Sequence, residues 1–364
     1  MWYERGTCCR ARKDKVVTFA TANCSIAFPF MQTPSLSVSV VLCTYNGAKF
    51  LREQLDTILA QDYPLLEVLV QDDGSTDDTA SIVAAYAERF PLIRWMKNEA
   101  AHGVNGNFFS AIAKAKGDLI AISDQDDLWE PDKVSSQVAA LGTKLMSICR
   151  SVPFTEDPSI SLDYDRRSPN HRLPRLLYSS VPGHTMVFRR SLLTKVPKEG
   201  EIYNRTYYDV ILGLTAAAYD GIVLVDRVLA HWRRHQEADT LLQADSRRKR
   251  SAGNALYMLR WSLTHYAAVK RCMRWHFQPR LDFLRAVAAD TEVWRDGVRM
   301  MACECRSGLC SYLELTRLYL KYRHELFYTY EKDPVAWVRA LLYPLMHMYN
   351  YRYLWERGIG KKQV

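Results

Sequence analysis

The 364-residue sequence predicts an α/β fold, in which a mostly parallel, Rossmann-like sheet carries helices on both faces and is followed by a C-terminal helical region. Three observations predict this architecture. Short β-branched apolar runs alternate with segments of helical apolar spacing between residues 37 and 122. Three of the four strands expected there end in polar, turn-forming clusters. From about residue 241 the apolar spacing is helical to the end of the chain.

The first third of the chain alternates strands with helices. Buried-type apolar runs predict strands over residues 37–43, 66–70, 92–96 and 119–122. Apolar residues at helical spacing predict helices over residues 50–59, 79–89 and 107–116. Strands that alternate with helices form parallel sheets, and ligands of such sheets bind beyond the carboxyl ends of the strands.

The later part of the chain is less regular. Residues 150–180 are polar and proline-rich, which predicts a long excursion near the site. A turn and strand over 182–188, a helix over 207–219 and a strand over 222–225 follow. We expect three parts: an N-terminal extension without fixed structure over 1–34, a sheet domain over 35–240 and a helical region over 241–364. The extension is interpreted as loose or non-native, with the working protein starting near Met31.

The charge is unevenly distributed. The chain has 49 Lys and Arg against 40 Asp and Glu, and its 48% hydrophobic and 24% charged residues exclude a disordered chain. Residues 247–274 contain no acid and eight basic residues: Arg247, Arg248, Lys249, Arg250, Arg260, Lys270, Arg271 and Arg274. Such a stretch fits nucleic acid, an anionic membrane or an acidic substrate, and is equally typical of a solvated helix face.

Two further sequence patterns bear on the cellular compartment of the protein. The sequence has no run of 18 apolar residues, so no transmembrane helix is predicted. The nine cysteines lack the paired spacing of a zinc site and are odd in number, which favours a reducing compartment. We expect a cytoplasmic protein, with peripheral contact to the cytoplasmic face of the membrane as a hypothesis.

The polar clusters at the strand ends carry the chemistry. Residues 124–127, Asp-Gln-Asp-Asp, bring three carboxylates together, and like charges this close repel unless a cation is present. Hard oxygen ligands suit Mg²⁺ or Mn²⁺, and Mg²⁺ prefers one or two carboxylates plus substrate phosphates. An Asp at 126 or 127 could instead simply cap the following helix. A second acidic turn, Asp72-Asp73-Gly74-Ser75, offers acceptors for a base edge or ribose hydroxyls.

Two nucleotide-binding classes are excluded by missing glycines. The first strand is not followed by G-x-G-x-x-G, and no G-x-x-x-x-G-K-[ST] occurs. These absences count against a nicotinamide enzyme and a P-loop NTPase. A nucleoside diphosphate held through a metal fits what remains.

Residues 36–140 resemble the nucleotide-sugar domain of family-two, GT-A fold glycosyltransferases, and a weaker likeness extends to about residue 240. The Asp-Gln-Asp-Asp-x-Trp segment is similar to the rhamnosyltransferase-like branch that builds bacterial surface polysaccharides. The runs that carry the likeness are Val40-Val41-Leu42-Cys43-Thr44-Tyr45-Asn46, Gln71-Asp72-Asp73-Gly74-Ser75-Thr76-Asp77-Asp78-Thr79, Gly117 to Lys133, Pro182-Gly183-His184-Thr185-Met186, Tyr208-Asp209 and Trp232-Arg233-Arg234-His235.

The resemblance implies a role for each matching position. Thr44, Tyr45 and Asn46 would line the nucleotide pocket, and Asp73 would bind the pyrimidine base. Asp124 would lie by the ribose and the metal, and Asp126 would ligate the metal on the diphosphate. Asp209 matches the catalytic base, while Arg233 and His235 match an element near the phosphates. Two departures are Trp232 in place of the usual Tyr, and Tyr208 where many members have an acid or His.

These roles describe an inverting enzyme. It would move a sugar from a UDP- or dTDP-linked donor to a saccharide or lipid-linked acceptor, with Mg²⁺ or Mn²⁺. Inversion needs one displacement, with a carboxylate as general base and cations for the leaving diphosphate. A retaining hydrolase would leave the nucleotide-like turns unexplained.

Three other interpretations remain open. A nucleotidyltransferase uses a similar sheet, but Thr44-Tyr45-Asn46-Gly47-Ala48 lacks its usual glycine-rich basic loop. A nucleic-acid-binding protein could use the basic residues 247–274, yet no helix-turn-helix, finger or RNA-recognition signature supports it, and no nucleic-acid partner is expected. A catalytically dead scaffold would not need the intact set of acids.

Overall fold

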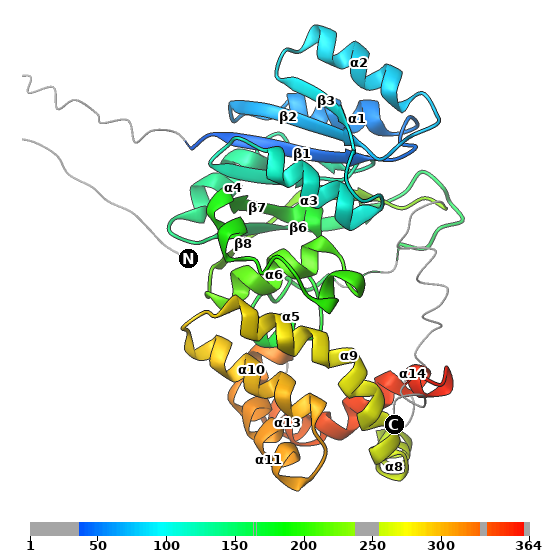
Figure 1. Ribbon diagram of the computed structural model, residues 1–364, viewed down its shortest axis with the longest axis vertical. Helices are drawn as coiled ribbons and strands as arrows, with labels where there is room; N and C mark the ends of the chain where they lie inside the picture. Colours follow the sequence, from blue (N-terminus) through cyan, green and yellow to red (C-terminus); the bar gives the residue numbers. More distant parts are fainter. Residues whose placement is uncertain (1–35, 163, 165, 237–254, 328–332, 360–364) are drawn as a thin grey trace, which may run out of the picture. The chain divides into compact units, whose positions relative to one another are not determined.

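Eight strands in one mixed sheet form the centre of the protein, in the order β3-β2-β1-β4-β7-β6-β8-β5 (Figure 1). The computed structural model describes residues 36–162, 164, 166–236, 255–327 and 333–359. The predicted N-terminal extension over 1–34 and the basic residues 247–250 lie outside the described residues. The strands are β1 (Val38–Thr44), β2 (Leu65–Asp72), β3 (Ile93–Lys97), β4 (Leu119–Ser123), β5 (Leu128–Trp129), β6 (Met146–Phe154), β7 (Met186–Arg189) and β8 (Ile222–Arg233).

The first four strands are parallel, as the alternation of strands and helices predicts. Beyond β4 the pairing changes: β7 is antiparallel to both β4 and β6, β6 and β8 are parallel, and β5 is antiparallel to β8. The fold-class prediction is confirmed. Sequence reasoning missed β6 and ended β8 too early, because the shared register of these two strands shifts near Cys149 and Arg150 and obscures a regular apolar pattern.

Helices cover both faces of the sheet. Val40 and Leu42 of β1 point to one face, where they pack with α1, α2 and α4. Val41 and Cys43 point to the other face, where they pack with α3 and α6. Burial on both sides explains why β1 is a continuous apolar run. The helices of this part are α1 (Leu51–Leu59), α2 (Thr79–Arg89), α3 (Val104–Lys114), α4 (Lys133–Leu141), α5 (Leu173–Leu176) and α6 (Tyr208–Ala218), with short 3₁₀ turns η1 (Gly183–Thr185), η2 (Arg190–Lys195) and η3 (Glu201–Asn204).

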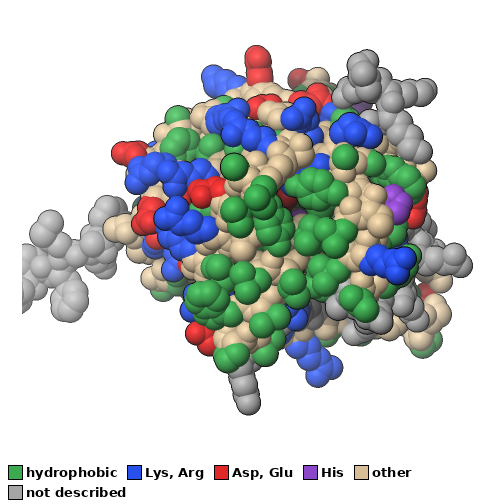
Figure 2. All heavy atoms as spheres, turned by 90° about the horizontal axis from the view of Figure 1, so that it is seen from below, with side chains coloured by type: hydrophobic (Ala, Val, Ile, Leu, Met, Phe, Trp, Pro, Cys, Tyr) green, Lys and Arg blue, Asp and Glu red, His purple; other side chains and the backbone are tan. Residues whose placement is uncertain are grey.

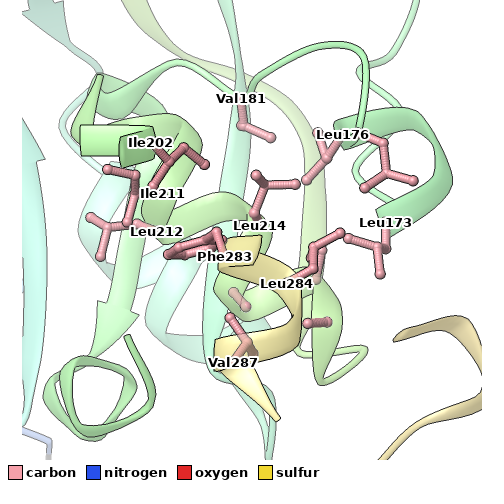
Figure 3. Packing of buried hydrophobic residues seen from close by; sticks show 14 of the residues in the cluster. Leu173, Leu176, Val181, Ile202, Ile211, Leu212, Leu214, Phe283, Leu284 and Val287 are labelled. Atoms are coloured by element: carbon pink, nitrogen blue, oxygen red, sulfur yellow. The ribbon is translucent and has the colours of Figure 1, made fainter. Parts of the chain in front are cut away.

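The C-terminal helical region packs directly against the sheet domain. Phe283, Leu284 and Val287 of α9 lie in one buried cluster with residues of α5 and α6, such as Leu173 and Leu212 (Figure 3). The two parts therefore share a hydrophobic core. The elements of the region are α8 (Ala255–Thr264), α9 (Tyr266–Val287), α10 (Glu292–Cys305), α11 (Leu309–Lys321), α12 (Arg323–Leu326), α13 (Asp333–Met348), η4 (Tyr349–Tyr351) and α14 (Arg352–Glu356).

A buried polar cluster lies inside the same region. Glu304 of α10 is 1% exposed, and its Oε1 accepts hydrogen bonds from the hydroxyls of Tyr319 at 2.7 Å and Tyr178 at 3.1 Å. Lys270 Nζ lies 3.4 Å from Glu304 Oε2 and also donates to the carbonyl oxygens of Cys303 and Glu304. This buried carboxylate therefore has a cation and two hydroxyl donors as partners.

Candidate active site

The polar clusters predicted at the strand ends meet at one edge of the sheet. The parallel strands β1, β2 and β4 end at Thr44, Asp72 and Ser123, so the segments that follow them lie side by side. Because β7 is antiparallel to β4, the residues before β7 reach the same edge, and these include His184 in η1. The topology thus brings together five separate segments of the chain, the fifth being the start of α6 with Asp209.

The segment after β1 is tied to the acidic segment by Gln125. Its Oε1 accepts hydrogen bonds from the Thr44 hydroxyl at 2.6 Å and the Tyr45 backbone N–H at 2.8 Å, and its Nε2 donates to the Tyr45 carbonyl. A Cβ atom on Gly47 would lie 2.3 Å from Gln125 Oε1, so this contact requires glycine there. Tyr45 is itself exposed and available to a ligand.

Asn46 joins the first and second clusters. It has a left-handed backbone with φ of 49°, its N–H donates to the Ser75 hydroxyl, and its side-chain oxygen accepts from the Thr76 N–H at 2.9 Å. Asparagine tolerates this conformation better than most residues. The predicted pocket residues at 44–46 therefore form one rigid wall with the turn after β2.

Asp73 is held from the other side. Its Oδ1 accepts a hydrogen bond from the Asn98 amide at 2.6 Å and lies 3.0 Å from His102 Nδ1, while its Oδ2 accepts from the Gly103 N–H at 2.7 Å. These partners follow β3 and precede α3. The carboxylate is therefore oriented by neighbouring backbone and side-chain groups at the edge where a base would lie.

Three potential cation ligands converge behind this wall. One oxygen or nitrogen atom from each of Asp124, Asp127 and His184 lies within 4.8 Å of the other two. His184 Nδ1 is 3.4 Å from Asp127 Oδ2 and 3.7 Å from Asp124 Oδ2. Burial, together with the nearby Asp124 and Asp126, raises the pKa of Asp127. Burial alone would lower the pKa of His184, but the two carboxylates outweigh it and raise that pKa.

Asp126 points to a different partner. Its Oδ2 lies 2.9 Å from His235 Nε2, and the His235 ring packs 4.9 Å from the ring of Phe50. The predicted metal ligands Asp124 and Asp126 therefore face different histidines, each from a segment far away in sequence. Asp124 belongs to the convergent group with Asp127, and Asp126 belongs to the pair with His235.

Arg233 is buried beneath the acidic segment. Its guanidinium forms ion pairs with Glu53 and Glu156 and lies over the rings of Phe50 and Phe154. Its Nε donates to the Asp126 carbonyl at 3.1 Å, and its N–H donates to Asp127 Oδ1 at 3.3 Å. In this arrangement Arg233 supports the loop that carries the acids. A cavity of about 200 Å³ adjoins it, lined by Lys49, Phe50, Thr155, Glu156, Asp157, Arg233, Arg234, His235 and Gln236.

Asp209 lies in the first turn of α6 and is coupled electrostatically to the convergent group. The pKa of Asp209 is raised to about 6, chiefly by burial and also by the Asp124 charge, whereas the Val210 N–H bond and His184 act in the lowering direction. The preceding Tyr208 is buried, stacks on Phe108 at 4.0 Å, and fills the space that a Cβ on residue 183 would need. Tyr208 therefore packs α6 in place, while Asp209 faces the site.

A divalent cation fits these donors. Asp127 Oδ2 is buried, and within the described residues no hydrogen bond satisfies it; His184 Nδ1, the ring nitrogen near it, is 3.4 Å away. Two carboxylates and an imidazole form a donor set that suits Mn²⁺ and, through its oxygens, Mg²⁺. Burying a carboxylate oxygen without a hydrogen-bond partner costs free energy of folding unless a cation binds to it.

Sequence reasoning found most of these residues but not their grouping. It named His184 within a motif without assigning it a role, and it treated Asp127 as part of the acidic run or as a possible helix cap, not as a cation ligand. The available signal was Pro182-Gly183-His184-Thr185 directly before a strand. That signal does not reveal that the strand is antiparallel, which is what moves His184 to the ligand-binding edge.

Comparison with known proteins identifies the domain. Residues 39–196, which include the segments after β1, β2 and β4 and η1, match the model of Glycosyl transferase family 2. This part of the chain belongs to glycosyl transferase family 2. The rhamnosyltransferase-like branch stays a prediction.

Two relatives of this domain are themselves uncharacterized. The chain is 25% identical over 211 residues to an uncharacterized glycosyltransferase of Nostoc, covering 55% of this chain and 65% of the relative. It is 39% identical over 108 residues to an uncharacterized protein of Mycobacterium bovis, covering 29% of this chain and 31% of the relative. The matches thus span less than two thirds of these relatives.

A solved structure supports the fold assignment. The crystal structure of S. aureus TarS 1–349 in complex with UDP-GlcNAc covers 89% of this chain and 92% of its own, with a TM-score of 0.51 and 17% identity. The likeness extends beyond the glycosyltransferase domain into the helical region. Within the residues that the structure describes, no helix is long and apolar enough to cross a membrane.

Proposed function

We propose that the protein is an inverting glycosyltransferase. It would transfer a hexosyl or rhamnosyl group from a UDP- or dTDP-linked donor to a saccharide or lipid-linked acceptor in surface polysaccharide synthesis. The observation that carries this proposal is the placement of Asp209, whose pKa of about 6 is set by burial and by Asp124, one of the convergent cation ligands. A base with this pKa is mostly ionised at neutral pH and still basic enough to accept a proton.

The transfer is one balanced displacement. The Asp209 carboxylate takes the proton of the acceptor hydroxyl, the acceptor oxygen forms a bond to the anomeric carbon, and the bond to the diphosphate oxygen breaks with its electron pair on the diphosphate. Attack on the face opposite the leaving group inverts the anomeric centre. The wall formed by Thr44, Tyr45 and Asn46, with Asp73 beside it, would hold the nucleoside and so orient the donor.

Asp124 and Asp126 are the proposed cation ligands. Asp124 would act with Asp127 and His184 of the convergent group, and Asp126 would act from its separate pair with His235. When bound, Mg²⁺ or Mn²⁺ would neutralise charge on the leaving diphosphate. Arg233 would act through the loop it supports, because its guanidinium is already paired with Glu53 and Glu156.

The test begins with donor binding. Melting temperatures are measured with UDP, dTDP and their sugars, each with Mn²⁺, Mg²⁺ or EDTA, because a ligand that binds the folded state raises them. We expect stabilisation by a pyrimidine nucleotide only with the cation, its loss in Asp124→Asn, and its retention in Asp290→Asn, a matched change at an exposed acid. A transfer assay with the selected donor then gives the anomeric configuration of the product. A retained configuration or cation-independent binding would contradict the proposal.

The proposed setting is the cytoplasm, where nucleotide sugars would be the donors and a lipid-linked acceptor would place the enzyme at the membrane. Support for the location consists of the free cysteines in the described residues, since Cys43, Cys149, Cys272, Cys303, Cys305 and Cys310 form no disulfide there.

A further inference from the structure

Large apolar side chains are exposed on three helices of the C-terminal helical region, α8, α11 and α13. Leu309 is 71% exposed and Leu256 is 70% exposed, values that are unusual for leucine. Hydrophobic side chains gather over the face seen in Figure 2, with both basic and acidic side chains at its margins. We define the apolar face as Leu256, Tyr257 and Leu263 of α8, Leu309 and Leu313 of α11, and Val335, Trp337, Val338 and Leu341 of α13.

Helical spacing aligns these residues. Leu309, Leu313 and Arg317 of α11 are four residues apart, so they form one row on the helix surface. The row ends in an arginine whose side chain is 81% exposed. In α8, Leu256, Arg260 and Leu263 follow the same kind of row. Each helix therefore presents leucines with an arginine in line with them.

Contacts between the helices join the rows into one face. The Tyr312 hydroxyl of α11 donates to the Leu341 carbonyl of α13 at 3.1 Å. The Tyr257 ring of α8 meets the Tyr349 ring of η4, directly after α13, at 5.8 Å. The exposed rows of α8, α11 and α13 therefore belong to neighbouring helices, and each of the nine side chains is at least 43% exposed.

The charge around the apolar face is basic. Its nearby acids are neutralised by neighbours, since Glu314 pairs with Arg317, Asp333 with Arg323 and His324, and Glu356 with Arg352. In the described part of the helical region, exposed arginines without an acid partner include Arg260, Arg271, Arg306 and Arg357. Two other residues of the predicted basic stretch have partners inside the protein. Lys270 is buried with Glu304, and Arg274 donates to the Cys305 carbonyl.

We propose that the apolar face docks on an anionic membrane surface. Leucines and aromatic rings would enter the boundary between headgroups and acyl chains, while Arg260, which has no acid partner among the described residues, extends to the anionic headgroups. Basic residues near an anionic surface add binding strength that salt screens. A second copy of this chain fits less well, because two basic faces would repel each other. The inference deepens the membrane setting of the proposed function by naming the docking surface, and vesicle binding tests it without any glycosyl transfer.

The test uses the full-length protein and sedimentation with vesicles. The vesicles contain either phosphatidylcholine alone or phosphatidylcholine with phosphatidylglycerol. We expect binding to the anionic vesicles at least fivefold above the zwitterionic ones, and weakened by 0.5 M salt. The double variant Leu313→Glu/Leu341→Glu should lower the bound fraction at least fivefold with an unchanged melting temperature. Leu66→Glu, at an exposed leucine of β2, is the matched control and should bind as the wild type does.

Several results would overturn the inference. These are absence of wild-type sedimentation with anionic vesicles, equal binding to both vesicle types, or unchanged binding by the double variant. Light scattering of the eluted protein provides a further check. A wild-type dimer that becomes a monomer in the double variant, without vesicle binding, would assign the face to self-association instead. Arg260→Glu/Arg317→Glu separates the charge contribution and should lower binding to anionic vesicles while leaving the apolar residues intact.

Discussion

The protein buries carboxylates in two places, and the two differ in how their polar atoms are satisfied. Glu304 in the helical region is 1% exposed and has two tyrosine hydroxyls and Lys270 as partners. Asp127 at the sheet edge is 3% exposed, yet its Oδ2 has no hydrogen bond within the described residues. A satisfied buried carboxylate contributes to folding, whereas an unsatisfied one beside other ligands indicates a binding site.

The largest expected effect concerns Asp209, which belongs to the unsatisfied side of this comparison. Asp209→Asn removes the proposed base, and the rate of sugar transfer should fall roughly 10²- to 10⁴-fold. Donor and cation should still raise the melting temperature of Asp209→Asn, because the cation ligands are unchanged. Rates with saturating acceptor, alongside melting temperatures with donor, measure both quantities. Transfer at the wild-type rate would remove Asp209 from the mechanism.

The second prediction concerns the satisfied carboxylate. Glu304→Gln leaves Lys270 buried without its partner, so the free energy of unfolding should fall by about 3 kcal/mol. Urea unfolding followed by circular dichroism measures it. Glu314→Gln is the control, since Glu314 is more exposed and lies 3.9 Å from Arg317, and should cost less than about 0.5 kcal/mol. If Glu304→Gln and Glu314→Gln lowered the free energy of unfolding equally, the buried partners of Glu304 would not contribute to folding as described.

The third prediction applies the same kind of change to Asp127. Because burial raises its pKa, the charged form opposes folding: its contribution is favourable at low pH and is lost as pH rises through the folded-state pKa. Asp127→Asn should therefore leave stability at pH 8 unchanged or higher. Binding of nucleotide with Mn²⁺ should weaken roughly tenfold to a hundredfold. Calorimetric titration gives the affinity, and loss of stability with unchanged affinity would reverse the assignment.

The smallest effect is the dependence of transfer on pH. The pKa of Asp209 is raised to about 6, and a base acts only when deprotonated. Transfer should thus be level above pH 7, fall to half near pH 6 and to about one tenth at pH 5. The profile of kcat/KM between pH 5 and 8 measures this. A profile that is level down to pH 5 would place the base elsewhere.

Prediction from sequence succeeded where the chain is locally regular. The alternating runs before residue 123 determined β1 to β4 and their parallel order, because helical crossovers allow little else. The polar clusters at 44–46, 72–75 and 124–127 were therefore placed correctly at one edge. β6 was missed because Arg150, Ser151 and Pro153 interrupt its apolar pattern, so the segment resembles a loop.

The site was less predictable where it depends on contacts between distant residues. His184 reaches Asp127 only because β7 is antiparallel, and His235 reaches Asp126 only because β8 is longer than its apolar run. Arg233, predicted from resemblance near the phosphates, lies between Phe50 and Phe154 with two glutamates as partners. Such pairings follow from packing, and no local pattern contains them.

The placement of α6 has a consequence for engineering. Its first turn carries Asp209, and its length packs against α9 in the core shown in Figure 3. The helical region therefore cannot be exchanged independently of the sheet domain. Replacing α9 with a helix of different side-chain volumes would shift α6 and displace the Asp209 carboxylate, although Asp209 itself is unchanged. Acceptor-range design in this chain should begin by keeping Phe283, Leu284 and Val287.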